Sequence, residues 1–391
     1  MPQKRDMRRY YSLLQFMYYG SFCVSVTFFV PVLQIYGWTD ANIGLVMTAV
    51  AAGGAIAQPV WGALCDRFRC TRAAVLIMTC VPVVFYALIV PFGHVPWVIS
   101  ALFVLTGMTN QSAAGIVDSW ASKMSGDGYE VSYGLSRGLG SLAYSLTSTV
   151  VGLLLARIGV GMLWPAALLF VPGMLLAVRG LPEPLLPAPS ERRKFGDDVS
   201  LLVKNKFFML LMLCYFVGMF TFGSMITFFP VALKSLGGTS AHFGIAYGAM
   251  AATELLTMGQ YKRLRRRFSC ETLLTVSFVF IGIKNVLVGI SPNVPCAMLS
   301  LLVQGLGYAL VVPGVVDYIA QRVDRRLLST AQLTVYAAGI SLSQVFSNLL
   351  CGYISAAVGP QTMLLLLSAP AFIGAAVWRF ATLRMEPVGR D

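Results

Sequence analysis

Five charged residues interrupt long apolar stretches of this sequence: Asp118, Arg137, Glu254, Lys284 and Asp317. If those stretches cross a membrane, each charge costs at least about 2.5–3.5 kcal/mol on insertion scales and needs a partner or a purpose. Carboxylates take up and release protons, whereas arginine and lysine balance their charge or donate hydrogen bonds to a solute. The residue types therefore indicate proton handling or the binding of a polar molecule.

Asp118 ends one apolar stretch and Arg137 opens the next, with the polar loop 119–136 between them. Both are expected near the same side of the membrane, where they can meet across the hairpin. Arginine offers a planar fork of donors to a polar substrate. The structural alternative is an interfacial ion pair that seals the inner side.

Glu254 lies about thirteen residues into its stretch, and Lys284 lies about twelve residues into the next, which runs the other way. At about 1.5 Å per residue, both fall in the middle or inner half of the membrane. A nearby ion pair keeps both charged, and breaking that pair lets Glu254 take up a proton. The alternative is a permanent buried pair that fixes the two helices.

Asp317 ends its stretch just before the basic loop Arg322–Arg326. A solvated helix end beside arginine therefore competes with a proton-coupling role for this residue. The eight cysteines show no metal-like spacing, and His94 and His242 fall at expected loops. Such a set cannot supply a metal site or a catalytic cluster, so we expect no cofactor and no enzyme activity.

The composition is that of a membrane protein: 57% of the 391 residues are hydrophobic and 12% are charged. A soluble domain has about a quarter of its residues charged. Apolar runs of about twenty residues, enough to cross the hydrocarbon core, recur along the chain. They predict an all-α fold with twelve transmembrane helices near 11–35, 41–64, 73–92, 97–121, 133–157, 161–180, 207–233, 241–261, 272–290, 295–320, 329–357 and 361–382.

The basic residues are distributed in loops on one side of these predicted spans. Of the 29 lysines and arginines, 25 fall at the two ends, in the central linker or in the loops of that side. Such asymmetry places both termini in the cytoplasm, in a plasma membrane such as the bacterial inner membrane. The net charge of +13 is spread over many loops, so it indicates a lipid bilayer and no nucleic-acid partner.

The chain repeats itself after about half its length. Between 27–44 and 227–244, eight of eighteen residues are identical. A single long period indicates duplication of a bundle, too long for a solenoid. We therefore expect two pseudo-symmetric six-helix bundles, at 1–180 and 207–391, joined by the Pro-rich and charged linker 181–206. Any site shared by both copies is expected between them.

A short loop carries the first family resemblance. The segment 62–72, GALCDRFRCTR, resembles the G-x-L-x-D-R-x-G-R-[KR] loop of the major facilitator superfamily, although Arg69 replaces its second glycine. In that family the loop is conformational, which implies such a role for Gly62, Asp66 and Arg67. Gly62 is expected to let backbones approach closely, and Asp66 to cap the next helix or to pair with an arginine.

A sharper resemblance lies around the predicted fourth and fifth spans. Asp118, Arg137 and the following aromatic residue Tyr144 are similar to the lactose permease and phenylpropionate permease branch. That similarity implies that Asp118 and Arg137 bind substrate and that Tyr144 stacks on it. The sequence Glu254-Leu255-Leu256 resembles the Glu-Leu-Leu of the eighth span of lactose permease.

The tenth span departs from those relatives. Where they commonly carry a histidine, this chain has Gln304, and Gly307 replaces the proton-carrying glutamate of lactose permease. Gln304 can hydrogen-bond a substrate but cannot titrate. Proton coupling is then left to Glu254, Asp118 or Asp317, with Lys284 as the base that balances Glu254.

These observations predict a monomeric secondary transporter that moves a small organic solute by alternating access, with protons as the coupling ion. No G-x-x-x-x-G-K-[ST] motif occurs, so a gradient must supply the energy. A facilitated-diffusion uniporter and a proton-antiport efflux transporter are alternatives within the same class. A transport-inactive membrane sensor or scaffold is the alternative from another class.

Overall fold

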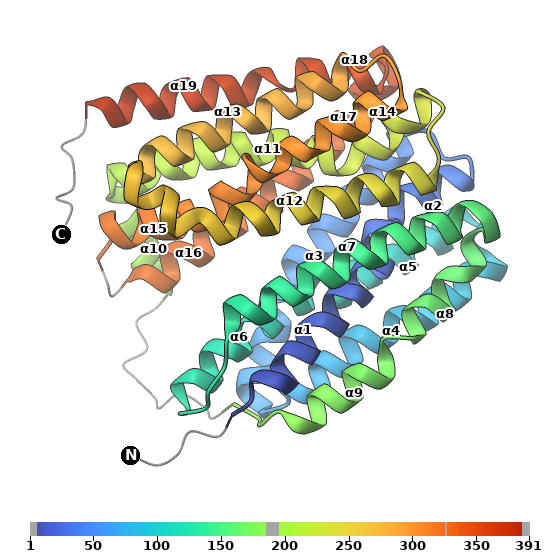
Figure 1. Cartoon of the computed structure of the whole chain (residues 1–391), viewed down its shortest axis with the longest axis horizontal. Coiled ribbons are helices and arrows are strands. Elements are labelled where there is room, and N and C mark those ends of the chain that lie inside the picture. Colours follow the sequence, from blue (N-terminus) through green and yellow to red (C-terminus); the bar gives the residue numbers. More distant parts are fainter. Residues whose placement is uncertain (1–5, 185–194, 325–326, 385–391) are drawn as a thin grey trace. The chain divides into compact units, whose positions relative to one another are not determined.

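The computed structural model describes residues 6–184, 195–324 and 327–384, and these form an all-helical fold (Figure 1). Within these ranges the only β-type pairing is an isolated bridge between Asp6 and Glu130. Arg8 contacts both of those carboxylates, at 2.9 Å and 3.2 Å. Hydrogen bonds from Arg8 lower the pKa of Asp6 to about 2, so Asp6 is ionised at neutral pH.

The helices divide into two compact units. The first unit comprises residues 1–188 and 238–252, and the second comprises 189–237 and 253–391. In the first unit, the helical segments are α1 (Arg8–Phe22), η1 (Cys23–Thr27), α2 (Phe29–Ile35), α3 (Asp40–Phe68), α4 (Thr71–Phe92), α5 (Pro96–Thr106), η2 (Gly107–Gln111), α6 (Ser112–Gly126), α7 (Tyr133–Ile158), η3 (Val160–Met162), α8 (Leu163–Leu168) and α9 (Val171–Gly180).

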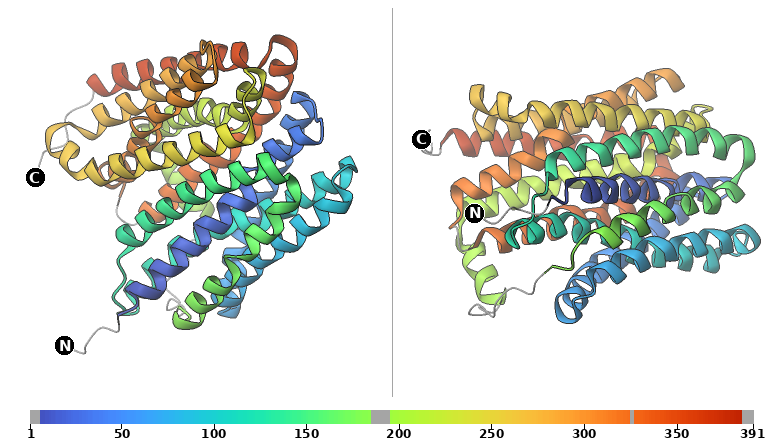
Figure 2. Two further views of the ribbon diagram at one scale, coloured as in Figure 1. Left: turned by 45° about the vertical axis from the view of Figure 1, so that its right-hand side comes forward. Right: turned by 60° about the horizontal axis from the view of Figure 1, so that its bottom comes forward.

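The second unit begins in the linker with α10 (Phe195–Lys204). Its helix α12 (Ser240–Arg267) contributes its first residues, up to Ala252, to the first unit. The remaining segments are α11 (Lys206–Ser235), α13 (Cys270–Gly289), α14 (Val294–Ser300), η4 (Leu301–Gly305), α15 (Tyr308–Arg322), α16 (Leu328–Tyr336), η6 (Ala337–Leu342), α17 (Ser343–Val358), α18 (Pro360–Leu366) and α19 (Ala369–Leu383). Figure 2 shows the same helices from two further directions.

Ten helical stretches of the described residues are long and apolar enough to cross a membrane. They are Arg8–Ile35, Asp40–Cys65, Thr71–Phe92, Tyr133–Ile158, Val160–Gly180, Lys206–Ser235, Cys270–Gly289, Val294–Arg322, Thr330–Val358 and Pro360–Leu383. The other two predicted spans, 97–121 and 241–261, are helical in α5–α6 and in α12 but are not among the ten. The count of twelve and the arrangement in two six-helix bundles remain predictions.

The internal repeat is visible in the backbone of the turns. Gly37 and its counterpart Gly237 have φ of +78° and +86°, and Gly159 and Gly359 have +86° and +85°. Side chains are strained in this left-handed region, so glycine is favoured at all four positions. The shared glycines therefore fix equivalent turns in each copy of the repeat.

Each unit has its own core of large side chains. In the first, Trp120 and Tyr11 are buried among residues of α1, α4, α6 and α9. In the second, Trp378 of α19 lies against Phe278 of α13, with ring centroids 6.2 Å apart and planes at 83°. Packing of this kind, and not a hydrophobic driving force, holds helices together in lipid.

Several long helices are interrupted in their middle. The segments η1, η2 and η6 are π-helical, and η4 is a 3-10 helix that contains Gln304. Such interruptions are frequent at functional sites because they redirect side chains and free backbone carbonyls. Two of these interrupted segments, η1 and η4, carry residues of the candidate site described below.

Candidate functional site

In the first unit, α1 holds the carboxylate of Asp118. The buried side chain of Gln15 donates from Nε2 to Asp118 Oδ1 at 3.0 Å and to the hydroxyl of Tyr11 at 2.6 Å. Tyr11 in turn donates to the backbone oxygen of Val117, at 3.0 Å. The half-buried Asp118 on α6 is therefore bound to α1 through a neutral amide.

The same helix positions Arg137. Its guanidinium carbon lies 4.0 Å from the ring centroid of Tyr19, and Nη1 donates to Ser141 Oγ at 3.1 Å. Gln15 and Tyr19 are four residues apart on α1, so they share one face. That face supplies one partner to Asp118 and one to Arg137, which brings these two predicted substrate-binding residues into one region of the first unit.

Tyr144 lies on the same face of α7 as Arg137, two helical turns further along. Its hydroxyl shares a hydrogen bond with Thr27 Oγ1 at 3.0 Å, at the end of the π-helical segment η1. The half-buried tyrosine thus extends the region of Asp118 and Arg137 along α7. The structure therefore groups these three predicted residues.

In the second unit, three predicted residues form a relay. The buried amine of Lys284 on α13 donates to Gln304 Oε1, and Gln304 Nε2 donates to Glu254 Oε1 at 2.8 Å. Lys284 is 1% exposed and Gln304 is 2% exposed, so the amine end of this bridge is shielded from solvent, whereas Glu254 is half-buried. A neutral amide therefore joins the acid to the base.

Aromatic rings cover the amine end of the relay. Lys284 Nζ lies 4.8 Å from the ring centroid of Phe222, which stacks on Tyr308 with centroids 4.6 Å apart and planes at 11°. A cation above an aromatic face is stabilised by the ring quadrupole, most strongly where water is excluded. The stacked pair also offers a flat surface to a ring-shaped solute.

Uncharged polar residues beside the relay were not anticipated from the sequence. Asn285 Nδ2 donates to Ser224 Oγ at 3.0 Å, and both side chains are fully buried. Among the described residues, Asn285 Oδ1 and Thr221 Oγ1 have no hydrogen-bond partner. Asn285 directly follows Lys284 in the sequence, and Thr221 directly precedes Phe222. This adjacency could have pointed to both residues, but neutral side chains do not stand out in an apolar span.

A comparison with known families fits this arrangement. The sequence profile described as "MFS_1 like family" matches residues 9–366, which is most of the chain. The chain belongs to the MFS_1 like family. It is therefore an integral membrane transporter of the major facilitator type and not an enzyme.

Individual relatives agree with that assignment. A maltose permease from Geobacillus stearothermophilus is 26% identical over 336 residues, covering 83% of this chain and 82% of the relative. A crystal structure of a mutant of the nucleoside transporter NupG has a TM-score of 0.81 at 14% identity, covering 95% of this chain and 98% of that one. The human organic anion transporter MFSD10 (TETRAN) has a TM-score of 0.67 at 18% identity, with the same two coverages.

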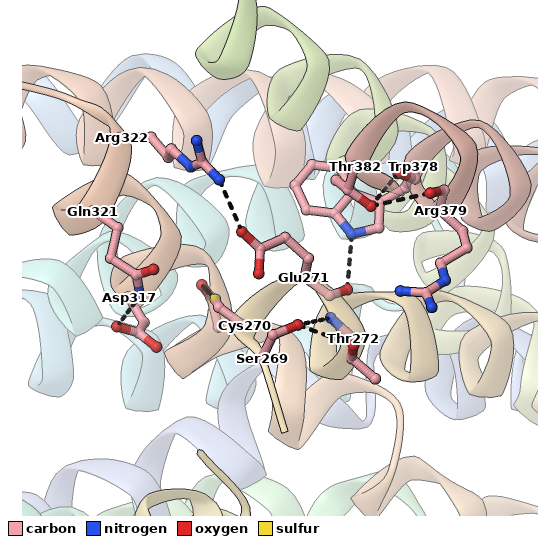
Figure 3. A network of polar contacts seen from close by, with 11 residues as sticks. Ser269, Cys270, Glu271, Thr272, Asp317, Gln321, Arg322, Trp378, Arg379 and Thr382 are labelled. Carbon is pink, nitrogen blue, oxygen red and sulfur yellow. Dashed lines mark hydrogen bonds and ion pairs between the residues drawn. The ribbon is translucent and has the colours of Figure 1, made fainter. Parts of the chain in front are cut away.

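Asp317 of this MFS_1-like protein takes part in other polar contacts, of which Figure 3 shows the one with Gln321. Its Oδ2 accepts from Arg265 Nε at 2.6 Å and from the hydroxyl of Tyr261 at 3.2 Å, and its Oδ1 accepts from Gln321 at 2.8 Å. Three donors hold this carboxylate of α15: Tyr261 and Arg265 from the C-terminal part of α12, and Gln321 from α15 itself. This arrangement favours the alternative of a helix-end ion pair over the predicted proton-coupling role.

The segment 62–72, predicted as a conformational loop, is mostly helical, because Gly62, Asp66 and Arg67 lie in the last turns of α3 and only Arg69 and Cys70 separate α3 from α4. Arg67 is exposed and its guanidinium carbon lies 5.4 Å from the ring centroid of Phe68. A Cβ built at Gly62 meets no described atom within 4 Å, so the close backbone approach expected there is not formed. The side chain of Asp66 lies outside the described part of the structure.

Glu183, from the start of the linker, caps the helix that follows this loop. Its two carboxylate oxygens accept from the backbone amides of Thr71 and Arg72, at 3.1 Å and 2.9 Å. Arg72 donates back to the backbone oxygen of Leu181. An acid at a helix N-terminus satisfies free amides and complements the helix dipole. The sequence reasoning missed this residue because it is more than a hundred positions away.

Proposed function

We propose that this protein is a proton symporter for a small, neutral, polar organic solute, which it moves across the membrane by alternating access. The observation that supports this most directly is the relay of Lys284, Gln304 and Glu254 in the second unit. Here a neutral amide is hydrogen-bonded to both an acid and a base, and a solute can replace the amide in one of these hydrogen bonds.

The relay suggests how solute and proton are coupled. A solute oxygen that accepts from Lys284 competes with Gln304 Oε1, and movement of that amide removes one hydrogen-bond donor from Glu254. A carboxylate in a low-dielectric site that loses a hydrogen-bond donor shifts toward the protonated form. Uptake of one proton by Glu254 therefore accompanies solute binding, and re-forming the bridge releases both.

A neutral solute fits the charge of the two clusters. The first unit offers one acid and one base, Asp118 and Arg137, and the second offers Glu254 and Lys284. A net charge on the solute would leave one of these groups uncompensated in a medium where that is costly. Rings near both bases, Tyr19 and the Phe222–Tyr308 stack, suit a flat or pyranose ring.

The relatives support the same class of solute. Maltose and nucleosides, named for two of the similar proteins, are both neutral and carry several hydroxyl groups. The resemblance of Asp118, Arg137 and Tyr144 to sugar-binding positions of the lactose permease branch points in that direction as well. We therefore propose a sugar or nucleoside as the first solute to test.

Uniport and proton-antiport efflux are the competing modes. An efflux transporter for apolar cations requires an acid without a balancing base, and Lys284 supplies such a base through Gln304. We also propose that the protein acts as a monomer in the plasma membrane with both termini in the cytoplasm. A transport-inactive scaffold remains the alternative from another class, and solute counterflow distinguishes it.

The solute is found first, by thermal-shift screening of sugars, nucleosides and aromatic acids on the purified protein. A ligand at a hundred times its Kd stabilises the folded protein by about 2.7 kcal/mol, which such a screen detects. The best compound then serves for uptake and counterflow in proteoliposomes. If none of the panel produces saturable counterflow, transport of these solutes is ruled out and the scaffold is favoured.

Proton coupling is tested with Glu254→Gln under an imposed pH gradient. We expect this variant to lose gradient-driven accumulation and to keep solute exchange, because exchange needs no net proton movement. Glu130→Gln is the matched control, since this acid is exposed and pairs with Arg8. Undiminished accumulation by Glu254→Gln would show that the proton binds elsewhere or that none is transported.

A further inference from the structure

The backbone that carries Gln304 changes its winding at the relay. Gln304 lies in the 3-10 helix η4, and α15 begins just after Gly307. The backbone amide of Gly307 donates to the oxygen of Gln304 at 3.1 Å and to that of Val303 at 3.4 Å. Bonds between residues three apart wind the chain more tightly than in an α-helix. The winding of this short turn therefore decides where the side chain of Gln304 points.

Two neighbouring helices of the second unit approach this turn closely. A Cβ built at Gly305 would lie 2.9 Å from Thr257 Oγ1 and 3.0 Å from the backbone oxygen of Thr253, both on α12. A Cβ built at Gly307 would lie 3.3 Å from Ile281 Cγ1 on α13. The two glycines let the backbones come together. The turn is thus packed against α12 and α13, the helices that carry the acid and the base of the relay.

One side chain binds the end of the turn to α13. The hydroxyl of Ser277 donates to the backbone oxygen of Gly307 at 2.5 Å, and Ser277 is 0% exposed. Ser277, Ile281 and Lys284 are spaced four and three residues apart, so they lie on one face of α13. That face binds the backbone of the turn through Ser277 and the side chain of Gln304 through Lys284.

The relay depends on the 3-10 winding of η4. Each residue advances a 3-10 helix by about 2.0 Å and an α-helix by about 1.5 Å, so rewinding the five residues of η4 as α-helix would shorten it by about 2.5 Å. Gln304 Nε2 donates to Glu254 at 2.8 Å, and a hydrogen bond is lost beyond roughly 3.5 Å. A displacement of that size breaks at least one of the two contacts of the amide.

We propose that Ser277 is a positioning residue of the relay. Its hydroxyl holds the turn in the winding that lets one amide bind both Lys284 and Glu254. Without the hydroxyl, η4 relaxes toward α-helical winding and Gln304 keeps at most one of these contacts. The inference rests on the relay of the proposed function and not on proton transport itself, because its test needs neither a solute nor a pH gradient.

A double-mutant cycle on the melting temperature tests the proposal. Ser277→Ala and Gln304→Met are measured singly and together in the purified, solute-free protein. If Ser277 positions the amide, Gln304→Met lowers the melting temperature less than half as much in the Ser277→Ala background as in the wild type, because part of the relay is already lost. Equal shifts in both backgrounds would mean that Ser277 only joins two helices, and would overturn the proposal.

Two further variants are the controls for this cycle. Ser277→Thr keeps a hydroxyl for the carbonyl of Gly307, so Gln304→Met should recover its full effect in that background, and no recovery would overturn the role of the hydroxyl. Ser347 is also fully buried and donates to a backbone oxygen of another helix, that of Phe220 on α11, at 2.9 Å. Because its contact does not involve the turn, Ser347→Ala and Gln304→Met should have additive effects.

Hydrogen exchange gives a second readout that does not depend on melting. Ser277→Ala should speed exchange of the backbone amides of η4 severalfold and leave α17 unchanged, because only η4 loses its anchor. Exchange in η4 that equals that of the wild type would overturn the proposal. Failure of proton-driven uptake changes neither readout, so the positioning role of Ser277 and the proposed symport are tested separately.

Discussion

Replacing Gln304 by methionine tests whether the amide really connects the acid and the base. Gln304→Met keeps the length of the side chain and removes both of its hydrogen-bonding groups. Lys284 then loses the acceptor of its amine, and Glu254 loses a donor at 2.8 Å. Because Lys284 is 1% exposed, water cannot replace the lost partner without opening the helices.

The size of the effect follows from these two contacts. A hydrogen bond to a charged group contributes about 1.5–3 kcal/mol, so loss of both costs about 3–6 kcal/mol if the two charges do not rearrange. Direct approach of Lys284 to Glu254 would reduce the cost toward the lower value. At about 2 °C per kcal/mol for a large chain, the variant should melt roughly 6–12 °C below the wild type.

The chain provides both the reporter and the control for this measurement. Five cysteines are buried, so a thiol-reactive fluorescent dye reports their exposure on heating: Cys23, Cys65, Cys214, Cys270 and Cys351. Gln321→Met is the matched variant, because Gln321 also donates to a carboxylate at 2.8 Å. Its partner Asp317 keeps Arg265 and Tyr261, so we expect a loss of about 1 kcal/mol or less.

Two outcomes would refute the reasoning. If Gln304→Met and Gln321→Met melt at the same temperature, the relay contributes nothing beyond an ordinary half-buried contact. If Gln304→Met also accumulates solute as the wild type does, the amide plays no part in coupling. Combining Gln304→Met with Glu254→Gln measures how much of the cost belongs to the bond between these two residues.

Two further predictions concern single residues. Arg137→Lys should weaken solute binding about tenfold or more, because lysine lacks the planar guanidinium that lies over the ring of Tyr19. Equilibrium binding measures this, and Arg157→Lys, at an exposed arginine, is the control. Unchanged affinity would mean that Arg137 has only a structural role. Gly237→Ala should destabilise the protein by about 1–2 kcal/mol because its φ is +86°, whereas Gly62→Ala, in an open helical position, should stabilise it by about 0.5–1 kcal/mol. The same dye assay measures both, and shifts of equal sign would contradict the backbone argument.

The sequence by itself determined the class of fold and the residues worth attention. Apolar runs and loop charges follow from the energy of transfer into lipid, which depends on each segment alone. Gly37 and Gly237 marked equivalent turns because left-handed backbone requires glycine in each copy. Charges such as Lys284 were conspicuous for the same reason, since an isolated charge in an apolar span is costly wherever the helix packs.

Only the tertiary structure decided which of these residues work together. The amide of Gln304 lies between Lys284 and Glu254 and binds both of them. Asp317 instead forms an ion pair with Arg265. Pairings of this kind depend on how helices distant in the sequence pack, and on distances of a few ångströms that no local pattern encodes. The neutral amide of Gln15, which binds Asp118, escaped notice because an uncharged side chain changes the hydropathy of a span very little, although once buried its hydrogen bonds must still be satisfied.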